Sequence, residues 1–318
     1  MTSKERVWKT IRFEGPDRLA MAAGPHADTV KVSHDLPTAF SPSVPGMDEW
    51  GSVWKSLHAE LGDQGQVVSY PLEDWSNFAH YRFPDPCAPG RFDRFAQKLA
   101  QVDRDKFVIG DLGFGPMHRL EYLLGFENYL MKLLLEPEHI ELLLDGIFAY
   151  LEGVVCQYAA YGLDGVIFFD DQAMQSGPLF SMDLWRELFA PRYTRLFRLI
   201  HEKRMAVYMH TCGNLQWHIP ELIRCGVDIL DNKQPESWAD SQAAQEARGK
   251  VTFSTCIDIQ KKMQHLTPDE VPEEVDRLVR RLSTPQGGII CTCYAADDLD
   301  ISPDLTARML EAMEQFRW

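Results

Sequence analysis

Short apolar runs alternate with longer amphipathic segments after about residue 100 of the sequence. Each run is rich in β-branched or aromatic residues and has the length of one buried strand. The runs are KFVIGDLG (106–113), DGVIFFDD (164–171), MAVYMHTCG (205–213), VDILDN (227–232), VTFSTCID (251–258) and GGIICTC (287–293). The segments between them show helical periodicity, and two carry start signals, Pro137 for 137–160 and Ser181 for 181–203. The other predicted helices cover 216–225, 268–283 and 303–316.

Strands that alternate with helices predict a parallel sheet with right-handed crossovers. The six runs, RLAMAAG at 18–24 and one strand in the Pro-rich region before residue 100 would complete eight strands. No glycine-rich phosphate turn follows the first strand, which favours a closed barrel over an open doubly wound sheet. We therefore expect an α/β protein with a (β/α)8 TIM barrel.

Domain organisation follows from the same pattern. The sequence shows no repeat, low-complexity tract or Ser/Gly linker, so we expect one barrel domain over 1–318. Residues 1 to about 100 are rich in Pro, Gly and aromatic residues and should form an irregular N-terminal part, while 101–318 should form the regular β/α units.

Composition narrows the class of protein. The 318 residues contain 32 basic and 47 acidic side chains, a net charge of −15, which disfavours nucleic-acid binding. No apolar run approaches the roughly 20 residues of a membrane span, and the start lacks the apolar core of a signal peptide, so we expect a cytoplasmic protein. Seven cysteines, an odd number, favour thiolate or metal chemistry over a disulfide framework.

Ligand-type side chains gather where the predicted strands end, which is where a barrel carries its chemistry. They are Asp111, Asp170, Asp171, His210, Cys212, Asp231, Asn232, Cys256, Asp258, Cys291 and Cys293. His210 and Cys212 are two apart on an extended segment and face the same side, and Gly213 then lets the chain turn away. Imidazole nitrogen and thiolate sulfur are zinc ligands, and a catalytic site uses about three protein ligands.

The third zinc ligand must come from another strand end. Cys293 lies further toward the rim than Cys291, so we rank Cys293 first and Cys291 second, and set Cys256 aside. The same His210 and Cys212 could instead act as base and nucleophile, but adjacent ligands on one side suit a shared metal better.

The remaining candidates have two interpretations each. Asp170 and Asp171 could hold a proton, orient a ligand or cap the next helix. Asp258, Asn232 and Gln234 could contact substrate or cofactor, or could stabilise loops. Trp50 and Trp54 belong to an aromatic group, with Trp75, Phe78 and Tyr81, that could line the pocket of a large apolar ligand or pack as core.

Four segments together resemble the uroporphyrinogen decarboxylase superfamily. They are LLGFENYLMKLLLEPEHIELLLD (123–145), GLDGVIFFDDQAMQSG (162–177), HTCGNLQWHIPELIRCGVDILDNKQPE (210–236) and VTFSTCIDIQ (251–260). The resemblance runs from about residue 45 to the C-terminus, and His-x-Cys-Gly is its most specific part. Within the superfamily, the sequence looks like the corrinoid-linked branch, typified by methylcobamide:coenzyme M methyltransferases and methyl-ether demethylases.

This resemblance implies an (α/β)8 barrel that binds zinc through His210, Cys212 and either Cys293 or Cys291. It implies a methyltransferase that moves a methyl group between a corrinoid (cobalamin) and a small thiol or a methyl-ether or methylamine-type substrate. Asp170 or Asp171, with Asp258, would position or protonate the substrate, while Trp50, Trp54, Asn232 and Gln234 would face the cofactor. The corrinoid would sit on a separate protein, because the sequence has no convincing Asp-x-His-x-x-Gly motif. A homodimer is possible.

Two alternatives stay open. The first is a metal-free decarboxylase of the same superfamily, and the second is a non-catalytic corrinoid or tetrapyrrole binder. The true decarboxylases carry an arginine-rich N-terminal motif for substrate carboxylates, whereas RLAMAAGPHADTV (18–30) has no arginine cluster. We therefore expect no local group of cations for a poly-acid substrate.

Overall fold

Eight strands form the central sheet of the computed structural model, which describes residues 1–56, 65–294 and 301–318. In spatial order they are β1 (Ala20–Met21), β12 (Ile289–Cys291), β11 (Thr252–Thr255), β10 (Ile229–Asp231), β9 (Ala206–His210), β6 (Gly165–Phe169), β5 (Phe107–Phe114) and β2 (Thr29–Ser33). The strands are parallel and form a nearly closed barrel, which confirms the predicted fold class.

The chain divides into two compact units, although the barrel is a single fold. The first unit contains 1–32, 102–111 and 163–318, and the second contains 33–101 and 112–162. The predicted change at about residue 100 does not coincide with this division, because 1–32 belongs with the barrel. The eighth strand, β2, lies before residue 100 as expected, although its exact position was not predicted.

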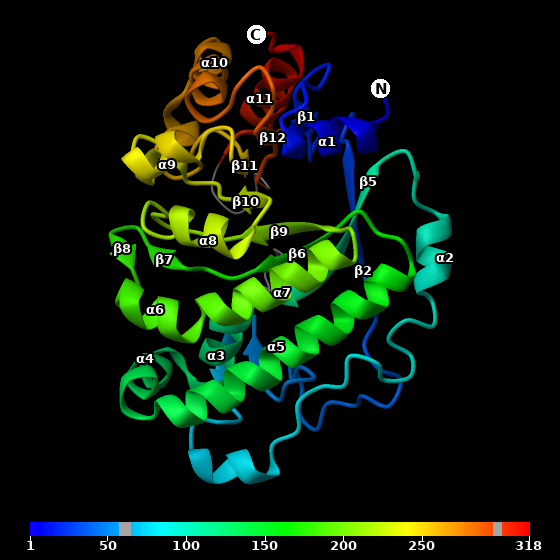
Figure 1. Ribbon diagram of the computed structural model, residues 1–318, viewed down its shortest axis with the longest axis vertical. Coiled ribbons are helices and arrows are strands. Elements are labelled where there is room, and N and C mark those ends of the chain that lie inside the picture. Colours follow the sequence, from blue (N-terminus) through cyan, green and yellow to red (C-terminus); the bar gives the residue numbers. More distant parts are fainter. Residues whose placement is uncertain (57–64, 295–300) are drawn as a thin grey trace. The chain divides into compact units, whose positions relative to one another are not determined.

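Helices follow most strands of the first unit (Figure 1). They are α6 (Met182–Leu188), α7 (Ala190–Glu202), α8 (Ile219–Cys225), α9 (Gln242–Ala247), α10 (Val271–Leu282) and α11 (Pro303–Gln315). From α7 to α11 each helix contacts the next, as expected for the outer layer of a barrel. The predicted helix 181–203 is two helices that meet at Phe189, and Ser181 caps the first by accepting from the Leu184 N–H, as predicted. No helix in the described ranges is long and apolar enough to cross a membrane.

Helix α1 (Ser3–Arg12) was not predicted and packs against the barrel. Thr2 and Glu5 form a capping box at its start. The helix contacts β1 and β12, and Val7 joins the core inside the sheet. The other core members are Ala20, Phe107, Ile109, Ile167, Ala206, Tyr208, Ile229 and Ile290. Because residues of one strand face that core in steps of two, this cluster identifies which side chains point into the barrel.

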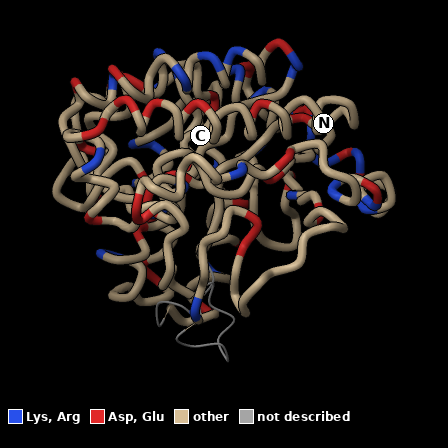
Figure 2. The backbone as a smooth tube through the Cα atoms, turned by 90° about the horizontal axis from the view of Figure 1, so that it is seen from below, with Lys and Arg blue, Asp and Glu red and all other residues tan. Residues whose placement is uncertain are grey.

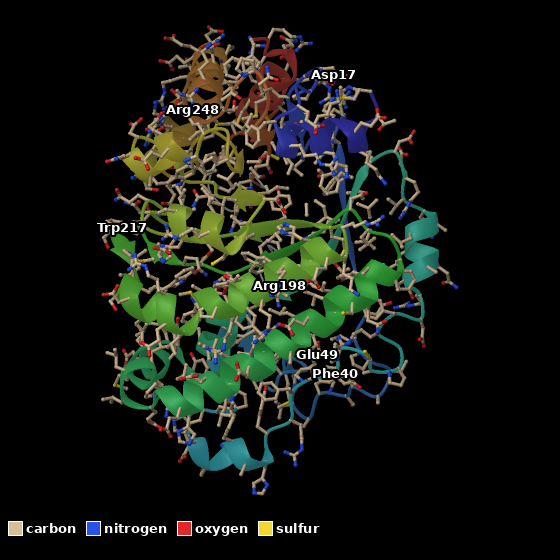
Figure 3. All side chains as sticks on the ribbon, viewed as in Figure 1. Asp17, Phe40, Glu49, Arg198, Trp217 and Arg248 are labelled. Carbon is tan, nitrogen blue, oxygen red and sulfur yellow. The ribbon has the colours of Figure 1, made fainter. Side chains whose placement is uncertain are left out.

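The second unit contains the remaining regular elements. They are the antiparallel pair β3 (Val53–Lys55) and β4 (Gln66–Ser69), the 3-10 helix η2 (Trp75–His80), and helices α2 (Phe95–Ala100), α3 (Pro116–Leu124), α4 (Phe126–Leu135) and α5 (Pro137–Ala160). Helix α5 has the bounds predicted from its periodicity. Glu49, labelled in Figure 3, forms a salt bridge with the fully buried Arg91 in this unit.

Acidic and basic residues alternate along many segments of the chain (Figure 2). The excess of acidic side chains is therefore not confined to one segment, so the net charge alone does not describe the electrostatic environment of an individual pocket.

Candidate metal centre at the strand ends

Alternation along β6, β9 and β10 directs the candidate ligands into the barrel. Ile167, Tyr208 and Ile229 belong to the inner core, so residues an even number of positions further on face the same side. On β9 this places His210 on the inner face, directly beside Asp231 of β10 in the strand register. The strands end at this level, and Asp171 and Cys212 follow in the adjoining loops.

Asp171, His210 and Cys212 come together as a group that could hold a metal ion. One ligand atom from each residue lies within 4.8 Å of the other two. Cys212 Sγ lies 3.5 Å from His210 Nε2, and the Cys212 N–H donates to Asp171 Oδ1 at 2.7 Å. The predicted pairing of His210 with Cys212 thus matches the geometry, and the inward member of the aspartate pair is Asp171.

The loop conformation that presents Cys212 requires glycine at position 213. Gly213 has φ +83°, and a Cβ there would lie 2.1 Å from the Ala173 carbonyl oxygen. Ala173 belongs to β7 (Ala173–Met174), which pairs with β8 (Gly177–Pro178) directly after β6. A side chain at 213 would therefore push the His-x-Cys segment away from this hairpin.

The donor set fits zinc. A tetrahedral ion with a Zn–S bond of about 2.3 Å and a Zn–N bond of about 2.0 Å separates sulfur from nitrogen by about 3.5 Å. This is the separation of Cys212 Sγ from His210 Nε2. Asp171 would supply the carboxylate oxygen of a three-ligand set, which leaves the fourth position for substrate.

Asp231 orients the His210 ring through Nδ1, and Lys233 pairs with Asp231. Asp231 Oδ2 lies 2.5 Å from His210 Nδ1, and the Lys233 ammonium pairs with Asp231 Oδ1. Burial alone would raise the pKa of Asp231, but the Lys233 ammonium and the His210 hydrogen bond outweigh it and hold this pKa well below its usual range. The fixed carboxylate leaves His210 Nε2 to face Cys212, the arrangement typical of metal-bound histidines.

Cys212 itself is not prepared as a free nucleophile. Burial, together with the Asp171 and Asp231 carboxylates, raises the pKa of the Cys212 thiol above its ordinary value. A reactive thiolate needs a cationic environment that lowers the pKa. A bound metal ion would provide that charge, so the environment of Cys212 favours the metal interpretation over the base and nucleophile pair.

Cys291 at the end of β12 and Cys293 just after it are outside the metal-competent group of the described residues. Cys291 is fully buried, and burial raises its pKa. It alternates with Ile290 of the inner core, so it points away from the barrel interior. Cys293 is half-buried and lies near enough to the Lys233 ammonium for that charge to act on its pKa, which burial raises. Asp171 thus occupies the place that sequence reasoning gave to a cysteine, and a role for Cys293 stays a prediction.

Asp170 and Asp258 lie away from the metal-competent group. Asp170 is fully buried and accepts from the Tyr193 hydroxyl and from Gln172 Nε2. Asp258 accepts three backbone N–H groups, from residues 236, 260 and 261, at 2.7 to 3.0 Å. Both carboxylates therefore stabilise local structure, and their contact with substrate stays a prediction.

Asn232 and Gln234 hold the loop that carries Cys212. The Asn232 side-chain amide donates to the carbonyl groups of Thr211 and Gly213, and the Gln234 side-chain oxygen accepts from the Gly213 N–H at 2.7 Å. These bonds match the loop-stabilising interpretation, and the cofactor contact of Asn232 and Gln234 stays a prediction. Cys256 is also fully buried, and burial raises its pKa to about 12.

Trp50 is a buried core residue of the second unit, and Trp54 is partly buried in the same unit. Trp50 is 2% exposed and packs edge-on against Tyr150, with ring centroids 4.9 Å apart. Trp54 stacks on Phe114 at 5.8 Å and contacts Tyr122. These contacts match the packing interpretation of the two tryptophans, and their cofactor role stays a prediction.

A pocket of about 400 Å³ opens beside His210. It is lined by Ala22, Thr29, Lys31, Ile109, Ile167, Phe169, Tyr208, His210, Asp231, Lys233, Thr292 and Tyr294. Sequence reasoning missed the two lysines and expected no local cations. Lys233 could have been predicted, because it lies two positions after Asp231 and therefore faces the inside of the barrel. Lys31 could not, because the position of its strand was not predicted.

The fold and this site define the class: a (β/α)8 barrel with a metal-competent group at the carboxyl ends of its strands. The chain belongs to the uroporphyrinogen decarboxylase family, whose model matches residues 58–315. This match confirms the family that the sequence resembled.

Solved structures and curated proteins give a second comparison. A methyltransferase from Methanosarcina mazei has a TM-score of 0.68 at 14% identity, with 99% of both chains covered. The catalytic core of xylanase A has a TM-score of 0.44 at 10% identity, covering 93% of this chain and 98% of that chain. Dihydropteroate synthase from Xanthomonas albilineans has a TM-score of 0.34 at 11% identity, covering 52% and 58%. The comparison with curated proteins gave no match. The similarity to the methyltransferase shows a shared fold over the full chain.

Proposed function

We propose that this protein is a zinc-dependent methyltransferase that moves a methyl group between a corrinoid on a separate protein and a small thiol or methyl-ether or methylamine-type substrate. The observation that carries the proposal is the convergence of Asp171, His210 and Cys212, whose spacing fits a tetrahedral zinc ion. Membership of the family and the shared fold with a methyltransferase support it.

Zinc bound by Asp171, His210 and Cys212 would supply a Lewis acid that lowers the pKa of a substrate thiol or polarises the bond to a departing methyl group. Asp231 fixes the orientation of His210, and Lys233 balances the charge of Asp231. Ile109, Ile167 and Phe169 give the pocket an apolar wall that limits water near the methyl group.

Metal content tests the proposal directly. Protein purified without added metal would be measured by elemental mass spectrometry, beside the variants Asp171→Ala, His210→Ala and Cys212→Ala, with Cys291→Ala as the matched control. We expect about one zinc per wild-type chain, loss of zinc in the first three variants and retention in Cys291→Ala. Cys293→Ala, measured in the same series, decides whether that thiol takes part.

The chemistry would then be measured with free cobalamin. Transfer of a methyl group changes the visible absorbance of cobalamin, and we expect this change to be lost in His210→Ala. A wild-type protein that stays without metal after reconstitution under reducing conditions would refute the zinc mechanism and favour a metal-free decarboxylase.

A further inference from the structure

We propose that Lys31 binds a single anionic group at the far end of the small substrate. The inference rests on the proposed function, because it takes the Asp171, His210 and Cys212 group as the place of the reacting end. Lys31 lies on β2 and lines the same pocket as His210. In the sheet order, β2 is three strands from β9 and four from β10, and four strands is half way around an eight-stranded barrel. The Lys31 ammonium lies 5.0 Å from the centre of the Phe169 ring, and the centroid of that ring lies 5.3 Å from the centroid of the His210 ring. A small ligand in the pocket can therefore meet both the reacting group and Lys31.

Two neighbours hold the Lys31 ammonium on the inner face. Its Nζ lies 3.0 Å from Oδ2 of Asp111, which is on the inward face of β5, and 5.0 Å from the centre of the Phe169 ring. An ammonium has three N–H donors, so a single carboxylate partner leaves capacity for a second acceptor. The Lys31 side chain is 48% exposed, and a ligand can therefore reach it.

Lys233 has a different role in the same pocket. Its side chain is 10% exposed and pairs with Asp231, which in turn holds His210. The Lys233 ammonium therefore balances the charge of the Asp231 carboxylate, which contacts His210 of the metal-competent group. Within the described residues that line the pocket, Lys31 is therefore the cation available to a ligand, and its pairing with Asp111 restrains its flexible four-carbon side chain.

The wall between the two ends sets the shape of the ligand. Ile109, Ile167 and Phe169 line the pocket between β5 and β9. An apolar wall favours a short hydrocarbon stretch between the anionic group and the reacting heteroatom. The substrate class is thus a small molecule with one carboxylate-type group at one end and a thiol or methylated heteroatom at the other.

Binding of two matched probes tests this inference without metal or turnover. The probes are 3-methoxypropanoate and 3-methoxypropan-1-ol, which have the same chain length and differ in charge. Titration of the full chain, followed by ligand-detected NMR, should show the acid binding at least about fivefold more tightly, because a charge-assisted hydrogen bond at a half-exposed site retains part of its strength. Lys31→Gln should remove the preference, and Lys31→Arg should keep it.

Two further variants separate the contact from general charge effects. Lys31→Gln/Asp111→Asn restores the local charge balance and should still lack the preference. Lys203→Gln removes an exposed lysine at the end of α7 and should leave the preference unchanged. Thermal unfolding of each variant checks that it is folded.

The outcomes distinguish this inference from the proposed function. A preference for the acid that survives Lys31→Gln overturns the inference whatever the metal content, and so does a wild-type protein that binds neither probe at millimolar concentration. A protein that shows the Lys31-dependent preference but holds no zinc refutes the proposed mechanism and supports the anion site.

Discussion

Acidification should destabilise the protein through His218, a buried histidine just before α8. The side chain is 1% exposed, packs edge-on against Trp185 with ring centroids 5.7 Å apart, and has no partner for its Nδ1 within the described part of the chain. Burial lowers the pKa of His218 from 6.5 to about 4, against a smaller opposing effect of Glu221. The folded state therefore keeps this imidazole neutral where the unfolded chain would protonate it.

The direction and magnitude of this change in stability follow from proton linkage. Because the folded pKa is depressed, the His218 contribution to stability is fully present above the unfolded pKa of about 6.5 and is lost as the pH falls toward the folded pKa of about 4. Between pH 8 and pH 5, protonation of His218 shifts the folding equilibrium toward the unfolded state by a factor of about 30, which corresponds to a loss of about 2 kcal/mol of stability. Further acidification toward pH 4 lowers the stability by up to about 1 kcal/mol more.

Urea unfolding of the wild type and of His218→Gln, at pH 8 and at pH 5, measures this contribution. Other groups titrate in both proteins, so the difference between the two pH-dependent changes isolates His218. We expect the wild type to lose about 2 kcal/mol more than the variant. Equal losses in the two proteins would show that His218 is hydrated or paired in the folded state and would refute the reasoning.

Three other predictions address the site and the second unit. Asp231→Asn should weaken zinc binding by about 10- to 100-fold, because it removes the carboxylate that orients His210, and competition with a chelator measures this; unchanged affinity would contradict the orienting role. Gly213→Ala should lower the thermal midpoint and reduce bound zinc, because its φ of +83° and the close carbonyl exclude a side chain; a fully loaded variant of wild-type stability would argue against this. Arg91→Met should destabilise the protein by about 3 kcal/mol or more in urea unfolding, because it leaves the Glu49 charge without its ion-pair partner. The double variant Arg91→Met with Glu49→Gln should lose less stability. Equal losses in the two variants would show that the ion pair is not the cause.

Local patterns were sufficient to predict the barrel and two of the three members of the metal-competent group. Each strand of the second half is a short apolar run that sits between helices, so its place was set by its own composition. His210, Cys212 and Gly213 are likewise close in sequence, and the period of two along a strand predicts that the two ligands face together. These inferences required no knowledge of which strands are neighbours.

The third member of the group depended on tertiary structure. Sequence reasoning looked for the third ligand among the cysteines and ranked Cys293 before Cys291 because it lies further toward the rim, and it did not consider Asp171 as a ligand. Yet β6 lies directly beside β9 in the sheet, whereas β12 lies three strands away. Asp171 therefore lies against Cys212 because their strands are neighbours in the sheet. The sequence alone does not show which strands are neighbours, except through the connections that a barrel imposes.

Strand order also explains how an acidic protein can accommodate an anionic ligand. A divalent ion held by Asp171 and an ionised Cys212 would form a neutral group, and Lys233 already pairs with Asp231. Lys31 and Asp111 balance each other in the same pocket region. The pocket is then close to neutral, although the chain as a whole carries a net charge of −15. Charges on the outer surface act weakly across more than about 8 Å of salt solution, so the local pairs, each built from neighbouring strand ends, determine which ligand the mouth accepts.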